Sequence, residues 1–234
     1  MAAETQVLVD NEKKYIAKFF SDASESDVKK VDLSTLSWAK HTITLSGAAS
    51  PNFKIGEVLT VGAEKYLVTG FTAGASTVEV VGWDNTNKKA TAIDASSSNG
   101  DAVSGGVSGN NTRTYSSIAE QDFNVLVTKI MWITNGLQVA IEWDGSGSEA
   151  YIAELSGNGS WSMPGNEWPG IGINASGDSG NVLGDIQFST TGHGSGDSYT
   201  IIMELKKQSG YDIPAYEQNN ILGYPVDYLL GNFT

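Results

Sequence analysis

The chain of 234 residues contains no cysteine, which excludes disulfide bridges and thiolate metal sites. It has only two histidines, His41 and His193, which lie far apart and lack ligand-like spacing with carboxylates. No apolar stretch is long enough to cross a bilayer, and Met1 to Val9 lack the basic start and apolar run of a signal peptide. We therefore expect a protein that is made in a cytoplasm and is not inserted in a membrane.

Charged residues are also scarce, at 18% of the chain, and acidic residues outnumber basic ones by 27 to 14. The resulting net charge of -13 repels phosphate backbones, so we expect no nucleic-acid partner. Small polar residues and 27 glycines take the place of the missing charges, while 40% of the residues are hydrophobic. This composition is typical of short strands joined by tight turns around a real core.

The first third of the chain reads mainly as strands. Gln6–Asp10 and Tyr15–Phe20 are apolar and β-prone, with a break at Asn11-Glu12. The apolar spacing in Val28–Leu36 fits either a strand or a turn of helix.

A group of short alternating segments follows, comprising Phe53–Gly62, Glu64–Phe71 and Thr77–Trp83. Their regular spacing and tight turns predict a small barrel or curled sheet over residues 37–97. The stretch KIGEVLTVGAEKYLVTGF resembles the small SH3-like modules inserted in phage tail and head proteins. Residues 98–111 have few large side chains and are predicted to be a flexible Gly/Ser linker.

The clearest turn signal is Asn135-Gly136, which lies between the β-prone runs Phe123–Thr134 and Leu137–Trp143. Both central residues of a tight hairpin turn need positive φ, which Asn and Gly accept, so we predict a hairpin here. Trp132 and Trp143 are predicted core residues, because burial of such a side chain contributes roughly 2–3 kcal/mol.

The last long predicted strand is Ser198–Lys206. Its alternation places Tyr199, Ile201, Met203 and Leu205 on one face and the intervening residues on the other. The final segment, 208–234, has two prolines, five aromatic residues and weak periodicity. It is predicted to be an extended arm that covers either the protein's own sheet or a neighbouring subunit.

We find no set of residues that predicts catalysis, a metal site or a cofactor. The GDSG string within Gly177–Asn181 lacks the context of a serine protease, and Glu142 and Asp144 would share one strand face instead of facing each other across a cleft. The loops Asp144–Glu149 and Asn174–Asn181 are rich in oxygen atoms but lack the spacing of an EF-hand. They allow at most a weakly bound calcium ion at the surface.

The segment from Val125 to Lys207 carries a resemblance to a family. The pattern VTKIMWITNGLQVAIEWDGSGSEAYIAELSGNGSWSM, a long glycine loop, and then GDIQFSTTGHGSGDSYTIIMELKK resembles virion structural proteins of tailed phages, particularly those of marine and cyanobacterial hosts. The opening ETQVLVDNEKKYIAKF fits the first strand pair of the same family. The resemblance spans roughly residues 1–36 and 117–207.

Together these features predict an all-β fold. Residues 1–36 and 112–207 are expected to form an antiparallel, jelly-roll-like β-sandwich with residues 37–97 as an inserted SH3-like β domain, followed by the linker and the C-terminal arm.

The resemblance implies a non-enzymatic virion component that forms homo-oligomers and contacts the major capsid protein or other virion subunits. We favour a capsid decoration or cement protein that bridges capsid subunits. A tail, neck or baseplate protein and a glycan-binding host-recognition module remain alternatives. The predicted interface residues are the large aromatic side chains of the Trp loop and the arm: Trp161, Trp168, Tyr211, Tyr216, Tyr224, Tyr228 and Phe233.

Overall fold

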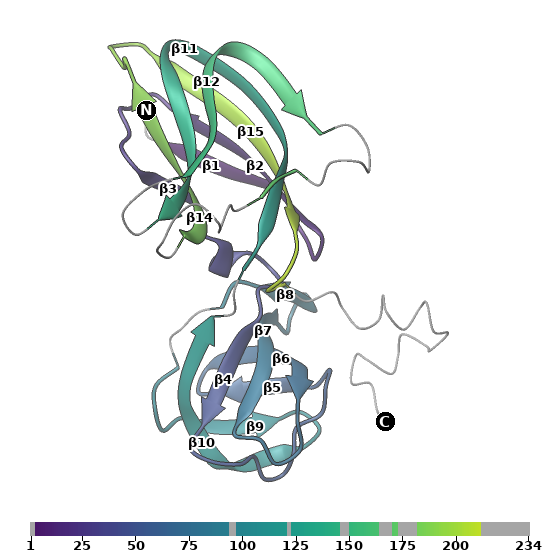
Figure 1. The fold of residues 1–234 in the computed structure, drawn as a ribbon. Coiled ribbons are helices and arrows are strands. Elements are labelled where there is room, and N and C mark those ends of the chain that lie inside the picture. The colour runs from purple at the N-terminus through teal and green to yellow at the C-terminus, as the bar shows by residue number, and fades with distance from the viewer. Residues whose placement is uncertain are drawn as a thin grey trace. The chain divides into compact units, whose positions relative to one another are not determined.

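The computed structural model describes residues 3–93, 97–120, 123–145, 150–163, 170–172 and 182–211, with the backbone alone at 182–184. Apart from one short 3-10 helix, the regular secondary structure of these residues is all strand, which confirms the all-β class (Figure 1). The elements are β1 (Glu4–Asp10), β2 (Lys14–Ser21), β3 (Val28–Val31), the 3-10 helix η1 (Leu33–Thr35), β4 (His41–Leu45), β5 (Val58–Val61), β6 (Glu64–Phe71), β7 (Thr77–Asp84), β8 (Lys89–Thr91), β9 (Ala102–Gly105), β10 (Gly109–Glu120), β11 (Val125–Gly145), β12 (Ala150–Ser162), β13 (Ile171–Gly172), β14 (Val182–Thr191) and β15 (Ser198–Lys207).

The chain divides into two compact units. The first unit combines residues 1–33 with 123–209, and the second combines 34–122 with 210–234. Residues 28–36, for which the sequence allowed a strand or a helical turn, contain both: β3 is followed by η1.

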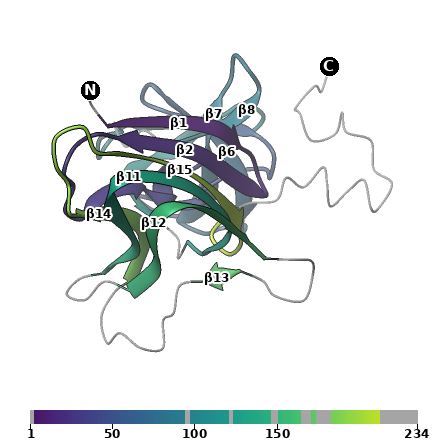
Figure 2. The same cartoon turned by 90° about the horizontal axis from the view of Figure 1, so that it is seen from above.

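The first unit is built on one antiparallel sheet in the order β1-β2-β15-β11-β14-β3, with β12 and β13 also paired to β11. Figure 2 shows β1, β2, β15 and β11 side by side in this order. The long strand β11 changes partner along its length. Its beginning, Val125 to Asn135, pairs with β15, and its end, Gln138 to Gly145, pairs with β14.

The predicted hairpin at Asn135-Gly136 is therefore wrong, because the strand continues through this dipeptide. Gly136 has a φ of 76°, and the backbone conformation that suits a hairpin turn here bends a strand instead. Strand β12 follows β11 on both sides of the bend and has its own positive φ of 66° at Gly157. Apolar residues in both arms of β11 are buried against β14 and β15, so tertiary packing overrides the local turn preference.

The bend turns the sheet back on itself and makes two layers. We call β1, β2, β15 and the beginning of β11 the first layer, and β3, β14 and the end of β11 the second layer. Phe188 of β14 meets Phe19 of β2 edge-on at a ring-centroid distance of 5.2 Å and meets Tyr199 of β15 at 6.0 Å. Aromatic rings from both layers thus form the core of a sandwich.

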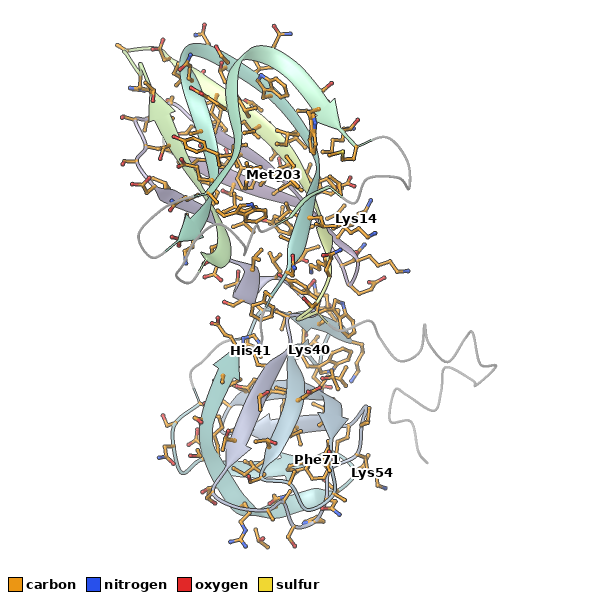
Figure 3. All side chains as sticks on the ribbon, viewed as in Figure 1. Lys14, Lys40, His41, Lys54, Phe71 and Met203 are labelled. Carbon is orange, nitrogen blue, oxygen red and sulfur yellow. The ribbon has the colours of Figure 1, made fainter. Side chains whose placement is uncertain are left out.

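Strict alternation in β2 and β15 directs one side of each strand into this core. The predicted inner face of β15, with Tyr199, Ile201, Met203 and Leu205, is buried as expected, and Figure 3 labels Met203 inside the unit. Trp143 is also buried, with 1% exposure.

Trp132 is only half-buried, so its predicted place in the core is wrong. Its indole Nε1 donates a hydrogen bond to the carbonyl of Ser156 at 3.2 Å, and its ring lies where a Cβ of Gly159 would stand. The indole therefore packs over Gly159 of β12.

A charged network is buried where the layers meet. The Glu25 carboxylate accepts hydrogen bonds from Lys30 Nζ and from the Tyr199 hydroxyl, both at 2.7 Å. Lys30 Nζ also lies 5.9 Å from the ring centroids of Phe188 and Tyr199. Burial, reinforced by the hydrogen bond to Glu25, raises the pKa of Tyr199, so this hydroxyl stays a donor.

The second unit contains the expected small β-barrel. Its strands run β4-β10-β9-β5-β6-β7, and β4 also pairs with β7, which closes the ring, while β8 extends from β7. The core consists mainly of aliphatic residues from alternate strand positions, with three aromatic rings: Ile43, Leu45, Ala49, Phe53, Leu59, Val61, Tyr66, Val68, Val78, Val80, Val103 and Tyr115.

The predicted linker at 98–111 is wrong, since β9 and the start of β10 lie there as strands of the barrel. Val103 is 2% exposed, and the buried Glu57 carboxylate accepts hydrogen bonds from the backbone of Val107 and Ser108. Gly105 is a position in this segment where no side chain fits, because a Cβ would collide with Ser108 and Glu57. Residues 112–122 also belong with this unit and not with the sandwich.

The bend yields a direct test with a matched control. A Cβ on Gly136 would collide with the carboxylate of Asp197, which accepts a hydrogen bond from the Gly194 amide at 2.6 Å, whereas a Cβ on Gly157 would meet nothing within 4 Å. We expect Gly136→Ala to lower the free energy of unfolding by about 2–3 kcal/mol, and Gly157→Ala by only about 1–2 kcal/mol of backbone strain. Urea unfolding of both variants measures this, and equal losses would contradict the close approach of the Asp197 carboxylate to Gly136.

Candidate interaction surface

The outer face of the first layer is formed by the side chains that alternate with the core residues. Their positions follow from the same two-residue period that buries Phe19 and Met203. They are Lys14, Ile16, Lys18 and Phe20 of β2, Thr200, Ile202, Glu204 and Lys206 of β15, and Lys129, Met131 and Ile133 of β11.

The centre of this face is apolar. In the strand register Ile202 lies between Lys18 and Met131, and Thr200 lies between Phe20 and Ile133. Ile133 is 63% exposed and Met131 41% exposed, whereas Ile16, Phe20 and Ile202 are half-buried. We call these five side chains the outer patch: Ile16, Phe20, Met131, Ile133 and Ile202. Contiguous exposed apolar side chains with a polar rim are typical of a protein interaction site.

Lysines lie toward one end of the outer patch, the end that holds Ile16. The sequence of the first unit contains eight lysines and sixteen carboxylate side chains, and four of these lysines lie on this one face. They are Lys14, Lys18, Lys129 and Lys206, and Figure 3 labels Lys14 at the margin of the unit. This end of the outer patch is therefore locally basic in an acidic protein, with Glu204 as the one carboxylate of β15 on the same face.

Two further lysines of the unit are buried and paired. Lys30 contacts Glu25, and Lys207 Nζ lies 2.6 Å from Asp10. Burial lowers the pKa of Lys207, against the opposing attraction of Asp10, and burial next to the same carboxylate raises the pKa of Tyr15 to about 12. The Lys207–Asp10 pair fastens the end of β1 to β15 and so helps to fix the strands that carry the outer patch.

The patch adjoins an open sheet edge. Strand β1 ends the sheet order and pairs with β2 alone among the strands described. Val7 is 53% exposed and Leu8 is 47% exposed at a bulge in the β1–β2 register. Edge strands without a partner can accept another strand, although a bulge limits how regular the added pairing can be.

The outer face of the second layer has a different character. Lys29 Nζ contacts the Asp185 carboxylate at 2.6 Å, and this hydrogen bond raises the pKa of Lys29. Glu142 and Gln187 are buried next to each other in the register. On the neighbouring strand β12 the exposed residues are Glu154 and Tyr151, the latter 71% exposed.

Few of the predicted interface aromatics fall on described residues. Trp161 is half-buried on β12, opposite Ile130, and Tyr211 is 6% exposed in the second unit, where it forms a β-bridge with Ala39. Tyr211 is thus buried by its own chain, which removes it from the candidate interface. The other predicted residues, Trp168, Tyr216, Tyr224, Tyr228 and Phe233, lie outside the described residues.

The histidines are held by backbone carbonyls. His41 Nδ1 lies 3.2 Å from the Ala39 carbonyl, and His193 Nε2 lies 3.1 Å from the Asp22 carbonyl. Burial lowers the pKa of His41, although the Ala39 carbonyl and Glu120 oppose this effect. Within the described ranges no three His, Asp or Glu side chains converge as metal ligands, and the loop 174–181 and residues 146–149 fall outside those ranges.

The outer patch was missed by the sequence-based choice of interface residues, which favoured tryptophan and tyrosine. A signal was present in KYIAKFFS, where Ile16 and Phe20 occupy the positions opposite to the core-facing Tyr15, Ala17 and Phe19. A strand with apolar residues on both faces, in a sheet with only one buried face, leaves one apolar set uncovered.

Comparisons with known proteins add no family. No protein-family model matches the chain, and no curated protein matches it. A solved structure described as manganese lipoxygenase of Gaeumannomyces graminis with part of zonadhesin of Komagataella pastoris aligns at 7% identity over 90% of this chain and 84% of the other. Its TM-score of 0.13 is too low to carry an argument. None of the helical residues in the described ranges forms a segment with the length and apolar character needed to cross a membrane.

Proposed function

We propose that the chain is a structural protein that joins subunits of a bacteriophage virion, and that the outer patch is one of its contact surfaces. The supporting observation is the exposure of Ile133 and Met131 on a sheet face that also carries three half-buried apolar side chains and, toward one end, four lysines. Apolar side chains of this kind are usually buried in a core. Here only contact with another surface can remove them from water.

The assignment to a virion rests on the resemblance of 1–36 and 117–207 to structural proteins of tailed phages. Among virion roles we favour a capsid decoration or cement protein that contacts the major capsid protein. Many copies, each with a modest contact, can together stabilise a shell.

A tail, neck or baseplate protein is the second candidate. The observation that favours it is the closed barrel of the second unit, because the same stretch resembles SH3-like modules of phage tails and heads. A glycan-binding module would need the Trp161–Trp168 loop, of which Trp161 is half-buried and Trp168 lies outside the described residues.

The test is to fractionate phage particles on a density gradient and quantify the chain by mass spectrometry. We expect it to band with the particles. A copy number comparable to that of the major capsid protein supports the decoration role, and a copy number far below it supports the tail role. Recovery of the chain only in the soluble fraction would contradict a virion role.

A further inference from the structure

We infer that the outer patch binds a second copy of this chain, in a head-to-tail contact with the exposed part of β12 that carries Tyr151 and Glu154. This inference deepens the proposed structural function and rests on it, because it names one of the subunits that the protein joins. It is supported by the exposure of apolar side chains, the segregation of charge and the side chains of β12.

The outer patch has the shape of a binding surface for another protein. Ile133 and Met131 are the most exposed members of an apolar cluster that crosses three adjacent strands, so a flat apolar partner surface can cover them together. The lysines at the Ile16 end keep that side of the patch hydrated and positive, which favours carboxylates beside the apolar centre of the partner surface.

The net charge of the chain favours a protein partner over a polyanion. Nucleic acid and anionic bilayers attract lysine patches, but they also repel the net charge of -13 on the whole chain. A protein surface with a few carboxylates satisfies the lysines without that extended repulsion. A copy of this chain is such a protein, with 27 acidic residues, and Glu204 is the one acidic residue among the outer-face positions of β2, β15 and the beginning of β11.

The complementary surface lies on β12. Tyr151 pairs in register with Glu142, and Glu154 pairs with Ala140, so both lie on the outward side of the second layer. Tyr151 is 71% exposed, and tyrosine is one of the side chains most enriched at protein interfaces. Glu154 is exposed nearby, and Asp144, half-buried on β11, adds a second carboxylate to this surface.

The two surfaces differ, so the contact is heterologous. A copy that binds through its outer patch still presents its own β12 surface to the next copy. The contact therefore builds rings or open chains and does not stop at a two-fold dimer, as suits a multi-copy structural protein.

The test measures association of the full-length chain by sedimentation velocity over a range of concentrations. We expect concentration-dependent species larger than a dimer, weakened by salt. Ile133→Asp is expected to reduce the association constant at least about tenfold, as for a central interface residue. The matched control is Ile55→Asp, because Ile55 is 57% exposed in the second unit and should leave association unchanged.

Charge reversal identifies the partner surface. Lys129→Glu and Glu154→Lys should each weaken self-association, because each places like charges across the contact. An equimolar mixture of the two variants should restore association, because each variant then supplies the surface that the other needs. Failure of the mixture to associate would overturn the head-to-tail pairing.

Other outcomes would also overturn the inference. A wild-type chain that stays monomeric up to its solubility limit would show that the outer patch does not bind a second copy. Binding to phosphatidylserine vesicles that is abolished by Ile133→Asp would show that the outer patch binds a membrane instead. A chain that bands with phage particles but is monomeric alone would leave the proposed structural function intact while removing self-association.

Discussion

Phe188→Ala is expected to lower the free energy of unfolding of the first unit by about 3–5 kcal/mol, the usual cost of removing a buried aromatic ring. Phe188 is 0% exposed and contacts Phe19 and Tyr199 edge-on across the two layers. Its loss leaves a cavity that the bent sheet cannot close without moving whole strands. Urea unfolding followed by circular dichroism measures the loss.

Phe20→Ala provides the control for this substitution. Phe20 is the same residue type on the opposite face of β2, where it is half-buried in the outer patch. We expect a smaller loss of about 1–2 kcal/mol, because the partly exposed ring gives up less buried area and leaves no enclosed cavity. Equal losses for Phe20 and Phe188 would contradict the assignment of the inner and outer faces.

Glu25→Gln is expected to cost about 3–5 kcal/mol, because the substitution leaves the Lys30 ammonium buried without a counter-charge. The side chains of Lys30 and Glu25 are 6% and 4% exposed, so water cannot replace the lost carboxylate. The rings of Phe188 and Tyr199, each 5.9 Å from Lys30 Nζ, offset only part of this cost.

A double-mutant cycle in urea unfolding separates this explanation from simple loss of packing. Lys30→Met combined with Glu25→Gln should recover much of the stability lost in Glu25→Gln alone, since no unpaired charge remains. A double variant whose loss equals the sum of the two single losses would mean that the ion pair contributes nothing to the fold.

Periodicity in the sequence predicted the strands well where one face is buried. In β15 the inner set Tyr199, Ile201, Met203 and Leu205 follows directly from alternation, because a strand has only two faces to choose between. The division into an inserted β domain and a surrounding sheet also follows from composition and spacing, except at its C-terminal boundary.

Local signals failed where tertiary pairing decides. Asn135-Gly136 has the sequence of a hairpin turn, yet β14 and β15 pair with consecutive parts of β11 and hold the strand open through the dipeptide. Residues 98–111 have the composition of a linker, but β9 within them pairs with β5 and β10 and so forms part of the barrel.

The candidate surface was not predicted for a related reason. The sequence-based choice ranked residues by aromatic character, whereas exposure depends on which face of the sheet each residue occupies. Tyr211 shows the limit of that ranking, since it is buried in the second unit.

The most direct measurement of the central claim is photo-crosslinking in assembled phage particles, with a photoreactive amino acid at position 133 and, as the comparison, at buried position 130. If the outer patch joins subunits, position 133 should form crosslinks to a neighbouring virion protein, including the β12 surface of a second copy, and position 130 should form none. A position 133 that reacts only with water in intact particles would show that the outer patch faces solvent, and the account of this protein as a joining subunit through that face would be wrong.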